Sequence, residues 1–386
     1  MDRAARRATF LRLAAPDIGD AEIEEMAGAI RSGWVTTGPR VARFERDLAE
    51  RAGAPFVRCT SSCTAALQLA LALAGVGRGD DVLVPAMTFV SCANVVEHAG
   101  ARPVLVDCEP ETGHIDLAHA ASLLGERTAA VMIVHLAGHP VDLDAVAAFS
   151  ARHGLAVIED AAHAIGAAWG GVPVGGHGNP AAFSFHATKN MTTFEGGALT
   201  LPDEAAYERA TRLSLHGLSR SAWSRHDTSS PADYDVPEPG FKSAMHDVAA
   251  AVGIHQLAGL DGRIERRAAL AALYDERLEE TGLELPPAVP AHARHAHHLY
   301  LVRVPADAPV SRDGLIEHLH RARIQSSVHF KGIHLYSHYR DRYGLRPQDL
   351  PVSTDRSERV LTLPLHPGMS EADVDDVAGV LAAALR

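Results

Sequence analysis

The chain has 386 residues, a hydrophobic content of 47%, a charged content of 22% and a formal net charge of −12. This composition is that of a soluble globular protein, and the negative charge argues against binding to nucleic acid or to an anionic membrane surface. No apolar run approaches the roughly 18 residues of a membrane span, and no long apolar region follows the basic first residues, so we expect no membrane helix, no signal peptide and a cytoplasmic protein.

From Asp20 to about residue 216, segments with helical periodicity alternate with short β-branched runs. Asp20 is predicted to cap a helix through residue 30, with an apolar face that includes Ile23 and Ile30. The runs predicted as strands are residues 81–85, 103–107, 130–134 and 155–159, with an amphipathic stretch at 142–153. Strands that are apolar throughout and separated by helices form parallel sheets covered on both faces, so we predict an α/β fold.

The C-terminal third has a different pattern. Residues 219–240 are rich in Ser, Asp and Pro and are predicted to form a long loop. Helical periodicity resumes near His246 and continues past Tyr274, and a final helix is predicted from its N-cap Ser370 to Leu385. Because the chain is too long for one small core, we predict a large domain of residues 1–255 and a smaller C-terminal α/β domain of residues 256–386.

Cysteines and histidines give no metal motif. The four cysteines are Cys59, Cys63, Cys92 and Cys108. They form no C-x-x-C pair, and we expect buried free thiols. A cluster of four histidines occupies positions 292, 295, 297 and 298. No cysteine or acid lies near it in sequence, so we predict no metal site and interpret the cluster as a polar connector into a strand at 299–304.

The most informative stretch is Phe183–Gly197, which carries Lys189 among small, aromatic and hydroxyl residues. Upstream, an apolar run that is typical of a buried strand ends in the acid Asp160. A lysine in a partly apolar setting can attack a carbonyl, and an acid at the end of a parallel strand lies where α/β sheets bind ligands. Together they fit pyridoxal phosphate (PLP), which needs a lysine for its aldehyde and an acid for its ring nitrogen. Taken alone, Lys189 could be a solvated surface lysine, and Asp160 could be a helix cap or an ion-pair partner.

The motifs Ser184-Phe-His-Ala-Thr-Lys189-Asn with Glu195-Gly-Gly, and Glu159-Asp160-Ala-Ala-His163-Ala, resemble those of the DegT/StrS-type nucleotide-sugar aminotransferases, which are PLP enzymes of fold type I. The likeness covers nearly the whole chain through further motifs at 32–39, 85–91, 134–138, 240–245 and 328–330. Within the family the motif sequences are most similar to those of the branch that aminates C4 of nucleotide-linked 4-keto sugars. Related sugar dehydratases carry histidine at the position of Lys189, so the lysine favours transamination.

The resemblance implies roles in the cofactor site. Lys189 would form a Schiff base with PLP and move the reaction's proton, and Asp160 would pair with the pyridinium nitrogen. The remaining cofactor contacts would be stacking by Phe89, a contact of His163 with the phenolic oxygen, and phosphate binding by Ser184, Ser62, Cys63 and Thr64. The last three precede a helix and offer its N–H groups to an anion. Alternatively, Phe89 could be a core residue, His163 could be a core or helix-capping residue, and Ser62 could be a plain N-cap.

Other roles implied by the resemblance involve a second chain and the substrate. Lys242 would reach across a homodimer interface to the partner's phosphate or substrate, so that each active site needs two chains. The implied substrate contacts are Trp34, Thr36, Thr37 and His329. Each of these could instead be a packing or turn residue.

The predicted reaction is a ping-pong transfer of an amino group from L-glutamate, which leaves as 2-oxoglutarate, to a nucleotide-linked 4-keto sugar. We favour dTDP-4-keto-6-deoxyglucose, in deoxyaminosugar and antibiotic biosynthesis, because the Ala- and Arg-rich composition suggests a GC-rich source. The alternatives are a UDP-4-keto-pentose, as in lipid A modification, and amination at C3. A non-catalytic regulatory homologue is a further alternative, which predicts the loss of Lys189 or Asp160, yet both are present.

Overall fold

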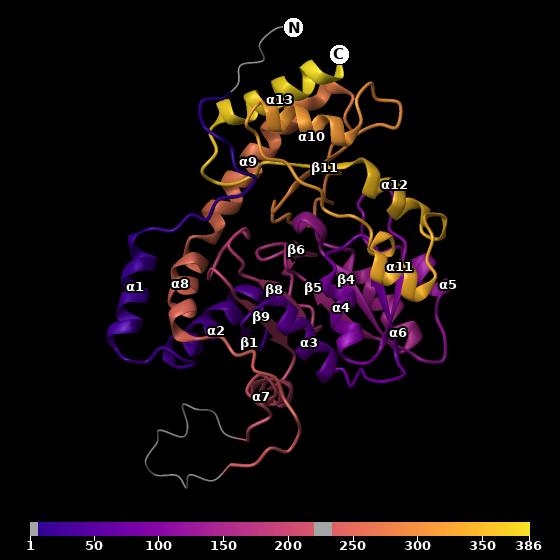
Figure 1. Ribbon diagram of the computed structural model, residues 1–386. Coiled ribbons are helices and arrows are strands. Elements are labelled where there is room, and N and C mark those ends of the chain that lie inside the picture. Colours follow the sequence, from indigo (N-terminus) through magenta and orange to yellow (C-terminus); the bar gives the residue numbers. More distant parts are fainter. Residues whose placement is uncertain (1–6, 220–233) are drawn as a thin grey trace.

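A seven-stranded sheet lies at the centre of the computed structural model, which describes residues 7–219 and 234–386 (Figure 1). Its strands are β1 (Phe56–Thr60), β2 (Asp81–Pro85), β3 (Arg102–Val106), β4 (Thr128–Val134), β5 (Ala156–Asp160), β8 (Ala181–Ser184) and β9 (Gly197–Leu201). Their order is β1-β9-β8-β5-β4-β2-β3. Only β9 runs antiparallel to its neighbours, and the other pairs are parallel.

Helices cover both faces of this sheet. One face carries α3 (Cys63–Leu73), α4 (Ser91–His98) and α7 (Glu204–Leu213), and the other carries α2 (Pro39–Ala52), α5 (Leu117–Ser122), α6 (Leu143–His153) and α8 (Asp247–Ala258). Along β2, Val82 and Val84 belong to the core beneath α3 and α4, whereas Leu83 belongs to the core beneath α6. This alternation is what a strand buried on both faces requires. The predicted fold class is confirmed.

Helix α1 (Asp20–Arg31) corrects one prediction. Gly19, not Asp20, is the N-cap residue, and its N–H donates to Glu22 Oε2 at 3.0 Å. Ile23 and Ile30 are 49% and 56% exposed, so the apolar face predicted for this helix points outward. The helix instead packs on α8 through its opposite face, where Glu22 accepts a hydrogen bond from Gln256 Nε2 at 2.8 Å.

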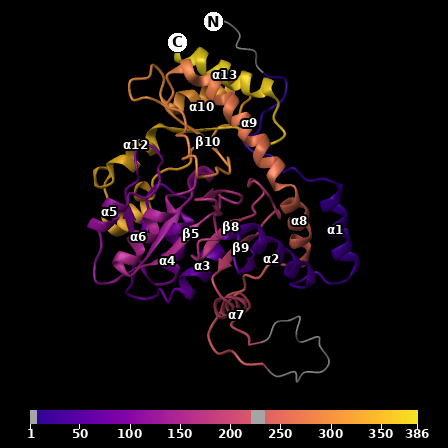
Figure 2. The same cartoon turned by 180° about the vertical axis from the view of Figure 1, so that it is seen from behind.

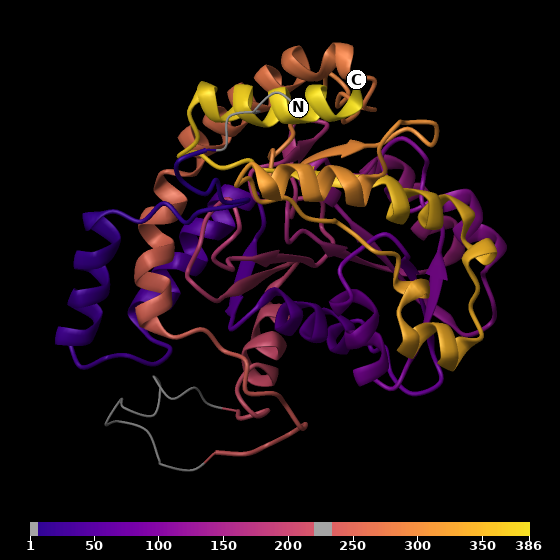
Figure 3. The same cartoon turned by 45° about the horizontal axis from the view of Figure 1, so that its top comes forward.

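A smaller unit lies above the large sheet in Figure 1. Its antiparallel strands β10 (Tyr300–Arg303) and β11 (Val360–Leu363) share a core with Leu11, α9 (Leu260–Leu278), α10 (Arg312–Arg321) and α13 (Glu371–Leu385). Figure 3 shows the yellow helix α13 on the outer side of this unit, away from the large sheet. As predicted, Ser370 is its N-cap. The remaining elements are β6 (Ala168–Trp169), β7 (Val172–Pro173), α11 (Ser337–Tyr343), α12 (Pro351–Arg359) and 3₁₀ turns at Leu136–Gly138, Glu279–Thr281, Ile333–Leu335 and Pro347–Asp349.

Helices α8 and α9 follow each other end to end, with a bend between them, and connect the two parts (Figure 2). The division into residues 1–255 and 256–386 stays a prediction, and its boundary falls within α8. Most of the loop predicted at 219–240 lies outside the described residues. Within the described ranges, no helix is both long enough and apolar enough to cross a membrane.

Candidate active site

A cavity of about 500 Å³ opens at the carboxyl ends of the parallel strands, facing the smaller unit. From the sheet side it is lined by Val134 at the end of β4, Asp160 at the end of β5 and Ser184 at the end of β8. From the smaller unit it is lined by His298 and His329. Parallel α/β sheets bind ligands at this edge because the strands there end in loops that project side chains into one crevice.

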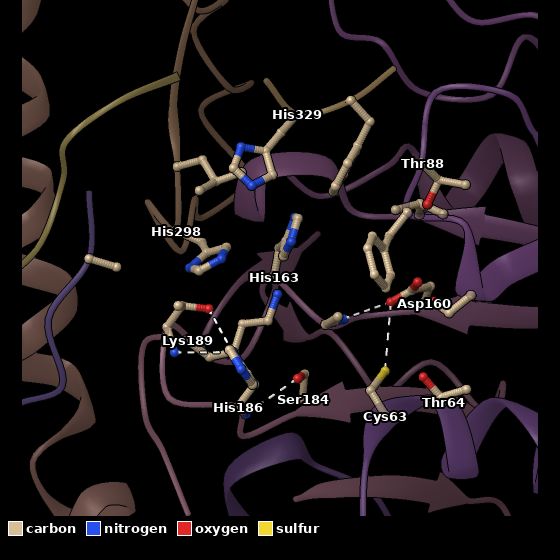
Figure 4. Close-up of a pocket in the computed structure, with 18 of the residues that line it drawn as sticks. Cys63, Thr64, Thr88, Asp160, His163, Ser184, His186, Lys189, His298 and His329 are labelled. Atoms are coloured by element: carbon tan, nitrogen blue, oxygen red, sulfur yellow. Dashed lines mark hydrogen bonds between the residues drawn. The ribbon is translucent and has the colours of Figure 1, made fainter. Parts of the chain in front are cut away.

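Lys189 lies in the loop between β8 and β9, and its side chain points into this cavity (Figure 4). The loop is tightly held: the N–H of Lys189 donates to His186 O at 2.9 Å, and Asn190 Nδ2 donates to Ala296 O at 2.6 Å. Thr192 Oγ1 donates to Phe185 O at 3.1 Å. The hydroxyl and amide side chains that surround Lys189 in the sequence therefore fix the backbone that carries it.

Burial lowers the pKa of Lys189 to about 8, although the carboxylate of Asp160 acts in the opposite direction. An amine with this pKa is partly unprotonated near neutral pH and can act as a nucleophile. Burial also lowers the pKa of His163 and His298 well below the ordinary value and that of His329 to about 4. These three rings are therefore neutral at neutral pH.

We expect the rate at which PLP attaches to the apoprotein to depend on pH through Lys189. Only the unprotonated amine attacks, so the rate should rise about tenfold per pH unit on the acidic side and level off above pH 8, the pKa of this lysine. Stopped-flow absorbance from about pH 6 to about pH 9 measures this dependence. A profile that is flat across pH 8 would show that the lysine pKa is not lowered in this way.

Asp160 is buried at the other side of the cavity. Its Oδ1 accepts from the Ala162 N–H at 3.0 Å, and its Oδ2 accepts from the Cys92 S–H at 3.0 Å. The Cys63 sulfur lies 3.9 Å from Oδ1 and 3.3 Å from the Ala182 carbonyl oxygen. Lysine and carboxylate, predicted to act together, thus face one space.

Two histidines present opposite hydrogen-bonding groups to the cavity. His163 Nδ1 accepts from the Ala137 N–H at 3.2 Å, so the neutral ring carries its proton on Nε2 and is a donor there. His298 Nδ1 lies 3.2 Å from Asn190 Oδ1. Asn190 uses its Nδ2 to donate to a carbonyl, so its Oδ1 accepts and leaves His298 Nε2 as an acceptor. The rings lie 4.5 Å apart between centroids.

The turn that holds His163 depends on a glycine. Ala137 and Gly138 have φ of 60° and 90°, the left-handed region that favours glycine. A Cβ at Gly138 would lie 2.8 Å from the carbonyl oxygen of His163. The motif at 134–138 therefore brings its backbone against the histidine and supplies the N–H that sets its tautomer.

The N-terminus of α3 forms a backbone cradle beside Lys189. Ser62 is its N-cap and accepts from the Ala65 N–H at 3.1 Å, so the capping role weighed for this serine is confirmed. The N–H groups of Cys63 and Thr64 have no acceptor within the helix and can bind an anion. A Cβ at Gly197 would lie 2.4 Å from the carbonyl carbon of Ser62, so the second glycine of Glu195-Gly-Gly lets β9 approach the cradle.

The structure brings together most of the predicted cofactor residues. Lining the cavity are Ser62, Cys63, Thr64, Phe89, Asp160, His163, Ser184, Lys189 and the predicted substrate residue His329. Phe89 is 57% exposed, so the alternative of a core phenylalanine is wrong. A buried amine, a carboxylate, an exposed aromatic ring and an anion cradle fit PLP, and their roles toward it remain predictions.

Four predicted residues do not reach this cavity within one chain. Trp34 Nε1 donates to Thr37 O at 3.1 Å, and Thr37 Oγ1 donates to Met245 O at 2.6 Å. The two predicted segments thus lie side by side. Thr36, Thr37 and Lys242 line a separate cavity of about 730 Å³. Contacts from these residues to cofactor or substrate would require a second chain.

His298 and Cys92 were not identified as site residues from the sequence. His298 lay in the histidine cluster interpreted as a polar connector; the segment is indeed largely irregular, but His298 is buried and lines the cavity. Its place directly before a strand was the one usable signal. Cys92 was predicted to be a buried thiol, which is correct, and only the fold shows that it contacts Asp160.

Comparison with known proteins identifies the family. The family model of the DegT/DnrJ/EryC1/StrS aminotransferases matches residues 16–382. The spore coat polysaccharide biosynthesis protein SpsC of Bacillus subtilis strain 168 is 41% identical over 374 residues, which cover 96% of each chain.

Solved structures agree with this match. Spr1654 from Streptococcus pneumoniae, assigned as a sugar aminotransferase and solved in its PMP form, has a TM-score of 0.91 at 32% identity, with 97% of this chain and 98% of that chain covered. The aminotransferase TlmJ from Streptoalloteichus hindustanus has a TM-score of 0.88 at 34% identity and the same coverage. The predicted family and enzyme class are confirmed. The chain belongs to the DegT/DnrJ/EryC1/StrS aminotransferase family.

Proposed function

We propose that this aminotransferase uses PLP to move an amino group from L-glutamate to a nucleotide-linked 4-keto sugar. The observation that carries the proposal is the buried Lys189, with its pKa lowered, facing the carboxylate of Asp160 across one cavity. The Spr1654 protein, 31% identical over 97% of this chain, has been solved in a PLP form, which supports the cofactor. When bound, PLP supplies an electron sink for the transfer.

The residues of this chain have distinct tasks. Lys189 holds the cofactor before the reaction and then carries a proton on Nζ to and from the reacting carbon. Asp160 pairs with the ring nitrogen, and His163 donates from Nε2 to the phenolic oxygen. Phe89 stacks on the ring. The hydroxyl of Ser184 and the N–H groups at the start of α3 bind the phosphate.

We further propose that the active site is shared between two chains of a homodimer. A nucleotide sugar carries two phosphates, yet the described residues that line the cavity include no arginine, and Lys189 is reserved for the cofactor. Lys242 is exposed on the segment beside Thr37, where it can serve a partner. Exposed apolar side chains on α1 and on these segments favour burial against a second chain: Ile23, Ile30, Val35 and Phe241.

A hybrid-dimer experiment tests the shared site. Lys189→Ala and Lys242→Ala homodimers should each be weakly active, because every site lacks one lysine. After unfolding and refolding together, half of the dimers are hybrids, and each hybrid has one site with both lysines. Activity should therefore return to about a quarter of the wild-type level. A mixture no more active than its parents would contradict the sharing of sites.

For the substrate we propose dTDP-4-keto-6-deoxyglucose, aminated at C4 in the cytoplasm for deoxyaminosugar or antibiotic biosynthesis. The name of the relative SpsC, which refers to polysaccharide biosynthesis, supports a sugar substrate. The UDP-4-keto-pentose, amination at C3 and a non-catalytic regulatory role remain the alternatives.

A competition assay separates these substrates. Purified protein with PLP and L-glutamate is given the dTDP-linked and UDP-linked 4-keto sugars in one mixture, and the amino sugars are resolved by mass spectrometry. We expect the dTDP-linked product to dominate, with nitrogen at C4 by NMR. If only the UDP-linked sugar is aminated, the substrate is instead the UDP-4-keto-pentose. No turnover with either sugar, together with bound PLP, would favour the regulatory alternative.

A further inference from the structure

A thiol holds the carboxylate of Asp160 from the side away from the cavity. Cys92, the second residue of α4, is fully buried and donates to Asp160 Oδ2 at 3.0 Å. Its sulfur also lies 3.3 Å from Thr88 Oγ1. A thiol has one proton, and Cys92 gives it to the carboxylate, so the Thr88 hydroxyl donates to the sulfur. The three side chains form an ordered series of hydrogen bonds that ends on Asp160.

The surroundings keep this thiol protonated. Burial raises the pKa of Cys92 well above its ordinary value, and the nearby charge of Asp160 acts in the same direction. Cys63 is arranged differently. Its sulfur is closer to the Ala182 carbonyl oxygen, which can only accept, than to Asp160, so its proton is directed to that carbonyl. Cys92 is the thiol that orients the carboxylate.

We propose that Cys92 is a positioning residue of the active site, which fixes the plane of the Asp160 carboxylate so that its free lone pairs face the ring nitrogen of PLP. This inference rests on the role of Asp160 proposed above. A carboxylate offers about four lone-pair directions, and Ala162 and Cys92 occupy two of them, one on each oxygen. The terminal torsion of an aspartate is broad, so one hydrogen bond alone would leave the carboxylate free to rotate.

The test compares Cys92→Ala, which loses the donor, with Cys92→Ser, which keeps one. For each apoprotein, the dissociation constant of PLP is measured by quenching of the intrinsic fluorescence. We expect Cys92→Ala to bind PLP about tenfold more weakly, the order of one hydrogen bond to a charged group, and Cys92→Ser to bind within about twofold of wild type. The visible absorption band of bound PLP should shift in the alanine variant and return in the serine variant.

Cys108→Ala is the matched control, because Cys108 is equally buried and lies outside the cavity. It loses the same thiol and should bind PLP as wild type does, while melting of the two alanine apoproteins reports any general loss of stability. Equal binding by Cys92→Ala and Cys108→Ala, or a serine variant as weak as the alanine variant, would overturn the inference. Asp160→Asn distinguishes failure of the proposed role of Asp160 from failure of the role of Cys92. If Asp160→Asn binds PLP like wild type, the role of Asp160 fails. If Asp160→Asn weakens binding and Cys92→Ala does not, only the role of Cys92 fails.

Discussion

Replacement of Lys189 by alanine is expected to lower the rate of amine transfer by a factor on the order of 10⁴ and to abolish covalent attachment of PLP. In the proposed mechanism the lysine supplies both the nucleophile that holds the cofactor and the base that moves the proton. Nothing else in the described cavity lining combines these properties, because none of its other side chains is a primary amine that can attach the aldehyde. Single-turnover kinetics with L-glutamate measure the rate, and borohydride reduction followed by mass spectrometry detects the attachment.

The site of covalent attachment can be assigned directly, because the chain has three lysines in all: Lys189, Lys242 and Lys331. Lys331→Ala is the control. Its Nζ lies 5.1 Å from the ring centroid of Tyr336, and the residue does not line the cavity, so this variant should keep wild-type attachment and rate. PLP that is still fixed covalently in Lys189→Ala, mapped to either other lysine, would refute the assignment.

Local sequence patterns predicted the parts of the fold that local interactions determine. The runs at 82–84 and 130–134 are apolar throughout, which is typical of a strand buried on both faces, and they lie within β2 and β4. The cavity's lysine and acid could be paired from the sequence because one chemical requirement, a PLP cofactor, needs both. Gly197 belongs to the Glu195-Gly-Gly motif of the resemblance, but only the structure shows that a Cβ there would collide with Ser62.

Other features depend on contacts that no local pattern encodes. Asp20 has the right chemistry for a cap, but the approach of Glu22 to the Gly19 N–H sets the start of α1 one residue earlier. The outward face of the same helix has the periodicity of a buried one, because periodicity does not say which surface will cover it. Cys92 is 68 residues from Asp160 in sequence, and only the fold brings its thiol within hydrogen-bond distance of the carboxylate. Lys242 is exposed in one chain, so the role proposed for it would depend on a second chain.

Asp160→Asn is expected to lower the rate of amine transfer by about 10²–10³-fold, the effect of removing one preorganised charge from a buried site. The amide is nearly isosteric, so the fold should survive, but it cannot stabilise a positive charge on the ring nitrogen. The rate of the glutamate half-reaction measures the loss.

The decisive control is a PLP analogue in which carbon replaces the ring nitrogen. Wild type and Asp160→Asn should then react at the same low rate, because the carboxylate has no charge to stabilise. If the variant is slower than wild type by the same factor with the analogue, Asp160 acts on something other than the ring nitrogen, such as the orientation of α4 through Cys92.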